Sequence, residues 1–206
     1  MKRSNVPAWW GGAALLGLAR AADAHIVGAR LGDFYAGALH PLTDLQDVVL
    51  WTALGLFAGS IGPASGRWLL LAVPAGLLAG VVLGFFFPVE LFGTLTNAVA
   101  MLALGLSIAA GVRLRTVPLC AIAFCLAVMR GAVTAADVAP ETNRVLFSAG
   151  LAAVGYAGIN LIMAATVAFR SADLHPTPSW RAIAIRVCGS WIAAIGLMIG
   201  GLALAS

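Results

Sequence analysis

Residues 67–87, RWLLLAVPAGLLAGVVLGFFF, carry no charge after Arg67 and are long enough as a helix to cross the roughly 30 Å of hydrocarbon in a bilayer. Other long apolar stretches occupy most of the remaining chain, at 45–62, 91–112, 117–136, 145–169 and 181–204. The connections between them are short and contain helix-breaking proline or glycine. The sequence therefore predicts an all-α, polytopic membrane bundle of six transmembrane helices.

The composition points to lipid as the solvent of this chain. Of its 206 residues, 62% are hydrophobic and 10% are charged, which leaves too few polar groups to cover a soluble globule. The formal net charge is +4, but removal of residues 1–24 would leave nine basic and seven acidic residues, or +2. This small excess gives no support for nucleic-acid binding, so the expected partner is the lipid bilayer.

The first 24 residues have the pattern of a secretory signal peptide. Lys2 and Arg3 precede a short apolar run, and Ala22-Asp23-Ala24 has the small residues that a signal peptidase recognises. We therefore expect a signal peptide over 1–24 and a six-helix domain over 25–206, with an uncleaved first helix as the alternative. Cleavage would make His25 the amino terminus, where the amine and imidazole together suit Cu²⁺ or Ni²⁺.

The distribution of charge predicts the orientation, because cytoplasmic loops are enriched in lysine and arginine. If residue 25 lies outside, six of the nine remaining basic residues lie inside: Arg67, Arg113, Arg115, Arg170, Arg181 and Arg186. Six of the seven remaining acidic residues then lie outside: Asp33, Asp44, Asp47, Glu90, Asp137 and Glu141. We expect a bacterial inner-membrane protein with both termini in the periplasm. Small residues four apart, including Gly76 with Gly80 and Gly196 with Gly200, predict close helix packing.

The segment before the first span contains the candidate metal ligands. Its sequence over residues 32–47, GDFYAGALHPLTDLQD, is too polar to span a membrane. Pro41 suits the first turn of a helix, and a helix that begins there would place His40, Asp44 and Asp47 at i, i+4 and i+7 on one face. An imidazole and two carboxylates so placed suit a divalent cation, with His25 as a further ligand. The alternative is that the two carboxylates only complement the positive end of the helix dipole.

Residues 34–59, FYAGALHPLTDLQDVVLWTALGLFAG, resemble the opening of the HupE/UreJ family of hydrogenase and urease accessory membrane proteins. The likeness continues through Ala24-His25, Arg130-Gly131 and the Arg186-Val-Cys-Gly189 block. The resemblance implies a small six-helix membrane protein with a cleaved signal, of a kind regarded as nickel or cobalt permeases.

The chain departs from the family pattern at the residues that matter for metal. The family continues its His-Pro, after two residues, with Gly-x-Asp-His, whereas this chain has Asp44, Gln46 and Asp47 in the last places. Arg130 stands where the family usually has histidine, and a fixed cation there opposes a divalent ion in transit. Asp47 in place of an imidazole offers a harder ligand and shifts preference away from Ni²⁺.

These patterns predict an inner-membrane secondary permease or metal-handling protein for nickel, cobalt or copper. The expected metal ligands are His25, His40, Asp44 and Asp47. The alternative is a structural or assembly subunit of a larger membrane complex that transports nothing, and a homo-oligomer is a further expected assembly. The sequence contains no phosphate loop, HExxH helix or nucleophile elbow, so we do not expect an enzyme.

Overall fold

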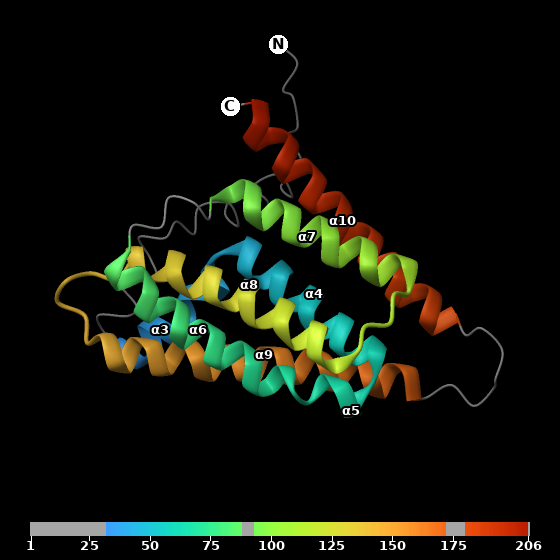
Figure 1. Cartoon of the computed structure of the whole chain (residues 1–206), viewed down its shortest axis with the longest axis horizontal. Coiled ribbons are helices and arrows are strands. Elements are labelled where there is room, and N and C mark those ends of the chain that lie inside the picture. Colours follow the sequence, from blue (N-terminus) through green and yellow to red (C-terminus); the bar gives the residue numbers. More distant parts are fainter. Residues whose placement is uncertain (1–31, 88–92, 172–179, 206) are drawn as a thin grey trace, which may run out of the picture.

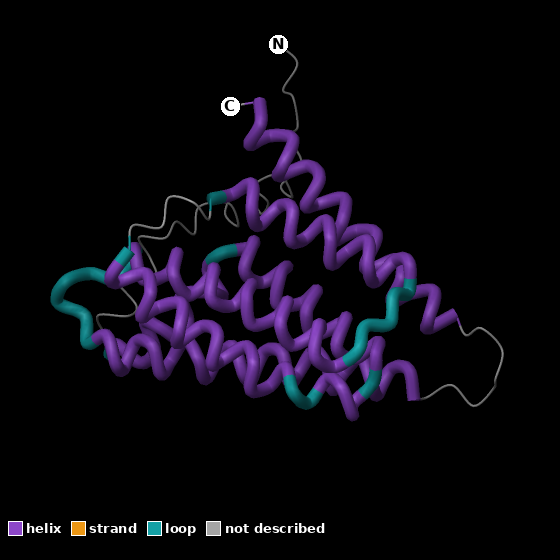
Figure 2. The backbone as a smooth tube through the Cα atoms, in the orientation of Figure 1, coloured by secondary structure: helices purple, strands orange, loops and turns teal. Residues whose placement is uncertain are grey.

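The computed structural model describes residues 32–87, 93–171 and 180–205, and within these ranges the chain forms helices and loops without strands. The predicted signal peptide, its cleavage site and His25 lie outside the described residues. Figure 2 shows that the described residues form helices packed side by side, with loops at the helix ends. Their bounds are α3 (Asp33–Thr43), α4 (Leu45–Ile61), α5 (Pro63–Gly66), α6 (Leu69–Phe86), α7 (Thr94–Ala110), α8 (Thr116–Ala136), α9 (Arg144–Ser171) and α10 (Trp180–Ala205).

Four helical stretches of the described chain are long and apolar enough to cross a membrane: Pro63–Phe86, Thr116–Ala136, Arg144–Ser171 and Trp180–Ala205. The helices α4 and α7 are apolar but have only 17 residues each, which gives a length of about 25 Å at 1.5 Å per residue. Each of the six expected spans coincides with one main helix to within three residues at either end. The chain is therefore a helical membrane protein, and crossing by α4 and α7 stays a prediction.

Helix α4 lies at the centre of the bundle (Figure 1). It packs between α9 on one side and α7 on the other, while α10 covers α7, α8 covers α6 and α3 covers the start of α9. Leu54, Phe57 and Ala58 of α4 are at most 2% exposed, as expected for a helix that is apolar on all sides. In the first turn of α4, Asp47 is buried although Leu45 is exposed.

The predicted close packing through glycine is confirmed at three helix pairs. A Cβ atom on Gly76 would lie 2.7 Å from the Ala127 side chain of α8, and one on Gly55 would meet Ile162 of α9 at the same distance. On α10, a Cβ atom at Gly196 would lie 2.7 Å from the backbone oxygen of Ala98. Gly200, which was expected to act like Gly196, makes only ordinary contact with α7.

The close contact between α7 and α10 predicts different effects on stability when two glycines of α10 are replaced by alanine. Gly196→Ala places a methyl group against the α7 backbone, and such overpacking costs about 1–3 kcal/mol. Gly201→Ala is the matched control, because nothing lies within 4 Å of the added atom. Thermal unfolding of the purified protein in detergent should show a lower melting temperature for Gly196→Ala only. Equal melting temperatures would contradict this packing of α10.

Candidate functional site

The segment that carries the predicted ligands is broken between two helices at Asp44. Pro41 lies in the last turn of α3 and not in a first turn, so the prediction of a helix beginning there is wrong. Asp44 has extended backbone angles, φ −96° and ψ 111°, and its Oδ1 accepts a hydrogen bond from the Gln46 backbone N–H at 2.9 Å. It therefore caps α4, as the helix-dipole alternative expected for this carboxylate. His40 and Asp47 lie on different helices and share no helix face.

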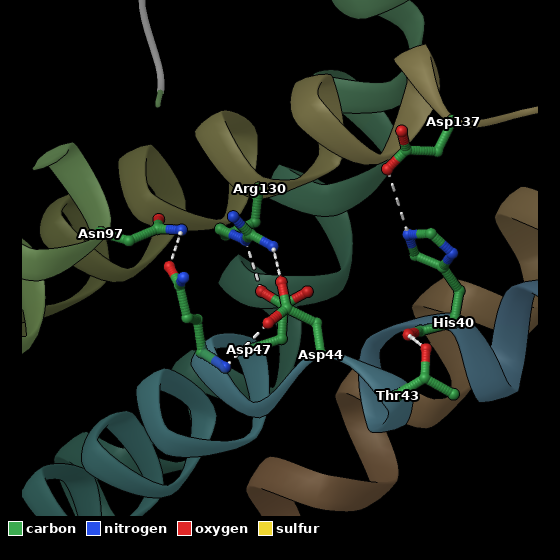
Figure 3. Close-up of polar contacts among 8 residues, drawn as sticks. His40, Thr43, Asp44, Asp47, Asn97, Arg130 and Asp137 are labelled. Atoms are coloured by element: carbon green, nitrogen blue, oxygen red, sulfur yellow. Dashed lines mark hydrogen bonds and ion pairs between the residues drawn. The ribbon is translucent and has the colours of Figure 1, made fainter. Parts of the chain in front are cut away.

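A buried arginine holds both carboxylates of this segment. Nη2 of Arg130, on α8, donates to Oδ2 of Asp44 at 3.1 Å, and Nε of the same guanidinium forms an ion pair with Oδ1 of Asp47. Asp47 is 2% exposed and Arg130 is 7% exposed. Burial of a charge away from water is costly unless an opposite charge compensates it. The three groups therefore fasten the end of α8 to the start of α4 (Figure 3).

His40 points away from this cluster and towards the end of α8 (Figure 3). Its Nε2 lies 3.8 Å from Oδ2 of Asp137, and its ring stands edge-on against Phe147 of α9. Asp137 was not among the predicted ligands. A signal was present in the sequence, because Arg130, Thr134 and Asp137 follow the i, i+4, i+7 spacing that puts side chains on one face of a helix.

These groups surround a pocket of about 440 Å³, which we call the carboxylate pocket. It lies between the α3–α4 junction, the start of α7 and the end of α8, and its lining includes His40, Asp44, Arg130 and Asp137. On the α7 side, Nδ2 of Asn97 donates to Oε1 of Gln46 at 3.1 Å, and both side chains line the pocket. Asn97 lies in the first turn of α7.

The carboxylate pocket carries an excess of negative charge. Asp44, Asp137 and the adjacent Asp47 contribute three carboxylates, and Arg130 contributes one guanidinium. With His40 neutral and the other groups ionised, the charges sum to −2. A concave site of this charge raises the local concentration of cations.

Of the four predicted ligands, the structure describes His40, Asp44 and Asp47, and it places them in two separate groups. Asp44 and Asp47 face Arg130, whereas His40 faces Asp137. Across 32–87, 93–171 and 180–205, no group of three or more histidine, cysteine, aspartate or glutamate side chains is arranged to hold a metal ion.

The buried ion pairs predict a large effect of removing the arginine. Arg130→Gln leaves two carboxylates in this region without their cation, and breaking a buried ion pair in this way costs about 3–5 kcal/mol. Asp47→Asn combined with Arg130→Gln should recover part of that loss, since it also removes a buried charge. Arg115→Gln, at an exposed position, is the control. Thermal unfolding in detergent should give the lowest melting temperature for Arg130→Gln, a higher one for the double variant and the wild-type value for Arg115→Gln. A wild-type melting temperature for Arg130→Gln would refute the role of these pairs.

Comparison with known proteins gives one family. The model of the family described as HupE / UreJ protein matches residues 13–199, which include every described helix except the end of α10. No curated protein and no solved structure gives a significant match to the chain.

Proposed function

Because the chain belongs to the HupE/UreJ family, we propose that it is an inner-membrane secondary permease or metal-handling protein for a divalent transition-metal ion, Ni²⁺, Co²⁺ or Cu²⁺. The observation that carries this proposal is the carboxylate pocket, where Asp44 and Asp137 in the lining and the adjacent Asp47 outnumber the one guanidinium of Arg130. The resulting charge of −2 is balanced by one divalent cation. The pocket lies at one end of α4, α7 and α8. In this proposal that end faces the side from which the ion arrives.

The separation of His40 and Asp137 suits a shared ion. Nitrogen and oxygen donors bind transition metals such as Zn²⁺ at about 2.0–2.2 Å, so two donors of one ion lie at most about 4.4 Å apart. The 3.8 Å between His40 Nε2 and Asp137 Oδ2 is within that limit. In this proposal the two side chains capture the ion first, His25 supplies an outer ligand, and Asp44 and Asp47 receive the ion deeper in the bundle.

Arg130 sets how strongly the inner carboxylates hold the ion. Its guanidinium already pairs with Asp44 and Asp47, so an incoming cation has to compete with it. Competition weakens binding at the inner position, and a permeant ion must be able to leave each site that it occupies. The same arginine opposes tight, permanent metal binding. It therefore favours transient handling of the ion over storage.

One observation favours the alternative function, a structural or assembly subunit without transport. In the described part of the chain no three-ligand cluster of metal-binding side chains is present. If the bundle instead packs against a larger membrane complex, it should copurify with a stoichiometric partner and contain no metal. Native purification followed by metal analysis separates the two functions.

Metal uptake by cells tests the proposed function. Cells that express the wild-type chain should accumulate more Ni²⁺ or Co²⁺ than cells without it, and His40→Ala or Asp137→Asn should lower this gain by about tenfold or more, because each removes a ligand. Glu141→Gln is the matched control, since this exposed acid does not line the pocket. Membrane levels of each variant are measured by immunoblotting. Equal uptake of Ni²⁺, Co²⁺ and Cu²⁺ with and without the wild-type chain would exclude transport.

A further inference from the structure

A second pocket lies at the opposite end of the central helices. Its volume is about 150 Å³, and three arginines line it, Arg113, Arg170 and Arg186. We call it the arginine pocket. Ser60 of α4 and Ile108 of α7 contribute to its wall, whereas the first turns of the same two helices border the carboxylate pocket. The two pockets are therefore separated by the length of α4, about 25 Å.

The arginines of this pocket are anchored to backbone oxygens at helix ends. Nε of Arg186 donates to the Ala109 oxygen in the last turn of α7 at 2.6 Å, and Nη1 of Arg170 donates to the Ser60 oxygen in the last turn of α4. Carbonyl groups at a helix C-terminus carry partial negative charge and orient a cation without cancelling its charge. Each guanidinium has five N–H donors, so most of them stay available to a ligand.

No carboxylate neutralises these three arginines within the ranges that the structure describes. The described ion pairs all belong to the other end of the bundle, where they involve Arg130 or His40. Arg113 and Arg186 are exposed, and Arg170 is half-buried. The described lining of the pocket thus combines three positive charges with unused donors. This combination attracts an oxyanion, and phosphate matches the planar donor geometry of guanidinium groups.

Exposed apolar side chains lie directly beside these arginines. Val112 lines the pocket and is 40% exposed, and Ile183 and Val187 on α10 are 56% and 49% exposed. Next to a charged pocket at a helix end, such a surface can lie along the acyl chains of a lipid. Basic pockets between transmembrane helices bind the headgroups of acidic lipids in the same way.

We propose that the arginine pocket binds the phosphate of an anionic ligand, supplied by an acidic phospholipid headgroup or by free phosphate. The exposed valine and isoleucine side chains favour the lipid. The inference uses none of the residues of the carboxylate pocket, so it stands or falls independently of metal handling.

The test uses the purified full-length protein in a neutral detergent. Its melting temperature is measured against increasing dioleoyl phosphatidylglycerol, dioleoyl phosphatidylcholine or inorganic phosphate. We expect phosphatidylglycerol, and not phosphatidylcholine, to raise the melting temperature. Arg113→Gln should raise the half-saturating concentration about tenfold, because a charge-assisted contact is lost. This variant should fold, since Arg113 is exposed and donates no hydrogen bond within the described chain.

Arg115→Gln is the matched control, because this exposed arginine lies in the same loop and does not line the pocket. A shift with phosphatidylglycerol alone that weakens in Arg113→Gln and not in Arg115→Gln supports a lipid headgroup. If inorganic phosphate raises the melting temperature, and this effect also weakens in Arg113→Gln and not in Arg115→Gln, free phosphate is supported as the ligand. Absence of a shift with both probes, or equal weakening in the two variants, overturns the proposal.

Discussion

The polar end of this protein depends on the ion pairs that Arg130 forms with Asp44 and Asp47. An arginine inside a bundle of apolar helices is stable there only because Asp44 and Asp47 compensate its charge. The pairing in turn fixes the break between α3 and α4, because Asp44 must leave the helix to cap α4 and to reach the arginine with its second oxygen. His40 then belongs to α3, faces Asp137, and forms the outer part of the carboxylate pocket.

In the proposed function, carboxylates take the place of the histidines of the HupE/UreJ pattern that this chain lacks. The third carboxylate, Asp137, leaves the pocket negative after Arg130 has been balanced. The opposite end of the same helices is positive, since Arg113, Arg170 and Arg186 gather there. Acidic side chains therefore line a pocket at one end of the described bundle, and basic side chains line a pocket at the other.

The helices could be predicted from the sequence because apolar length is a local property. Every expected span corresponds to a helix, and the close packing at Gly55, Gly76 and Gly196 follows from small residues at helical spacing. The break at Asp44 could not be predicted in this way. Both Pro41 and Asp44 are residue types that favour the start of a helix. In the structure α4 starts after Asp44, whose side chain also contacts Arg130, 86 positions away in the sequence. The pairing of Asp137 with His40 could not be predicted either, because the two residues are far apart in the sequence.

The most direct test of this account is a Co²⁺ titration of the purified protein, followed by the visible absorption of the bound ion. The account predicts saturable binding of one ion per chain in the wild-type protein and much weaker binding in Asp137→Asn, whose pocket has lost one of the two carboxylates that line it. Wild-type protein that shows no saturable Co²⁺ binding, or Asp137→Asn protein that binds the ion as tightly as the wild type, would contradict it.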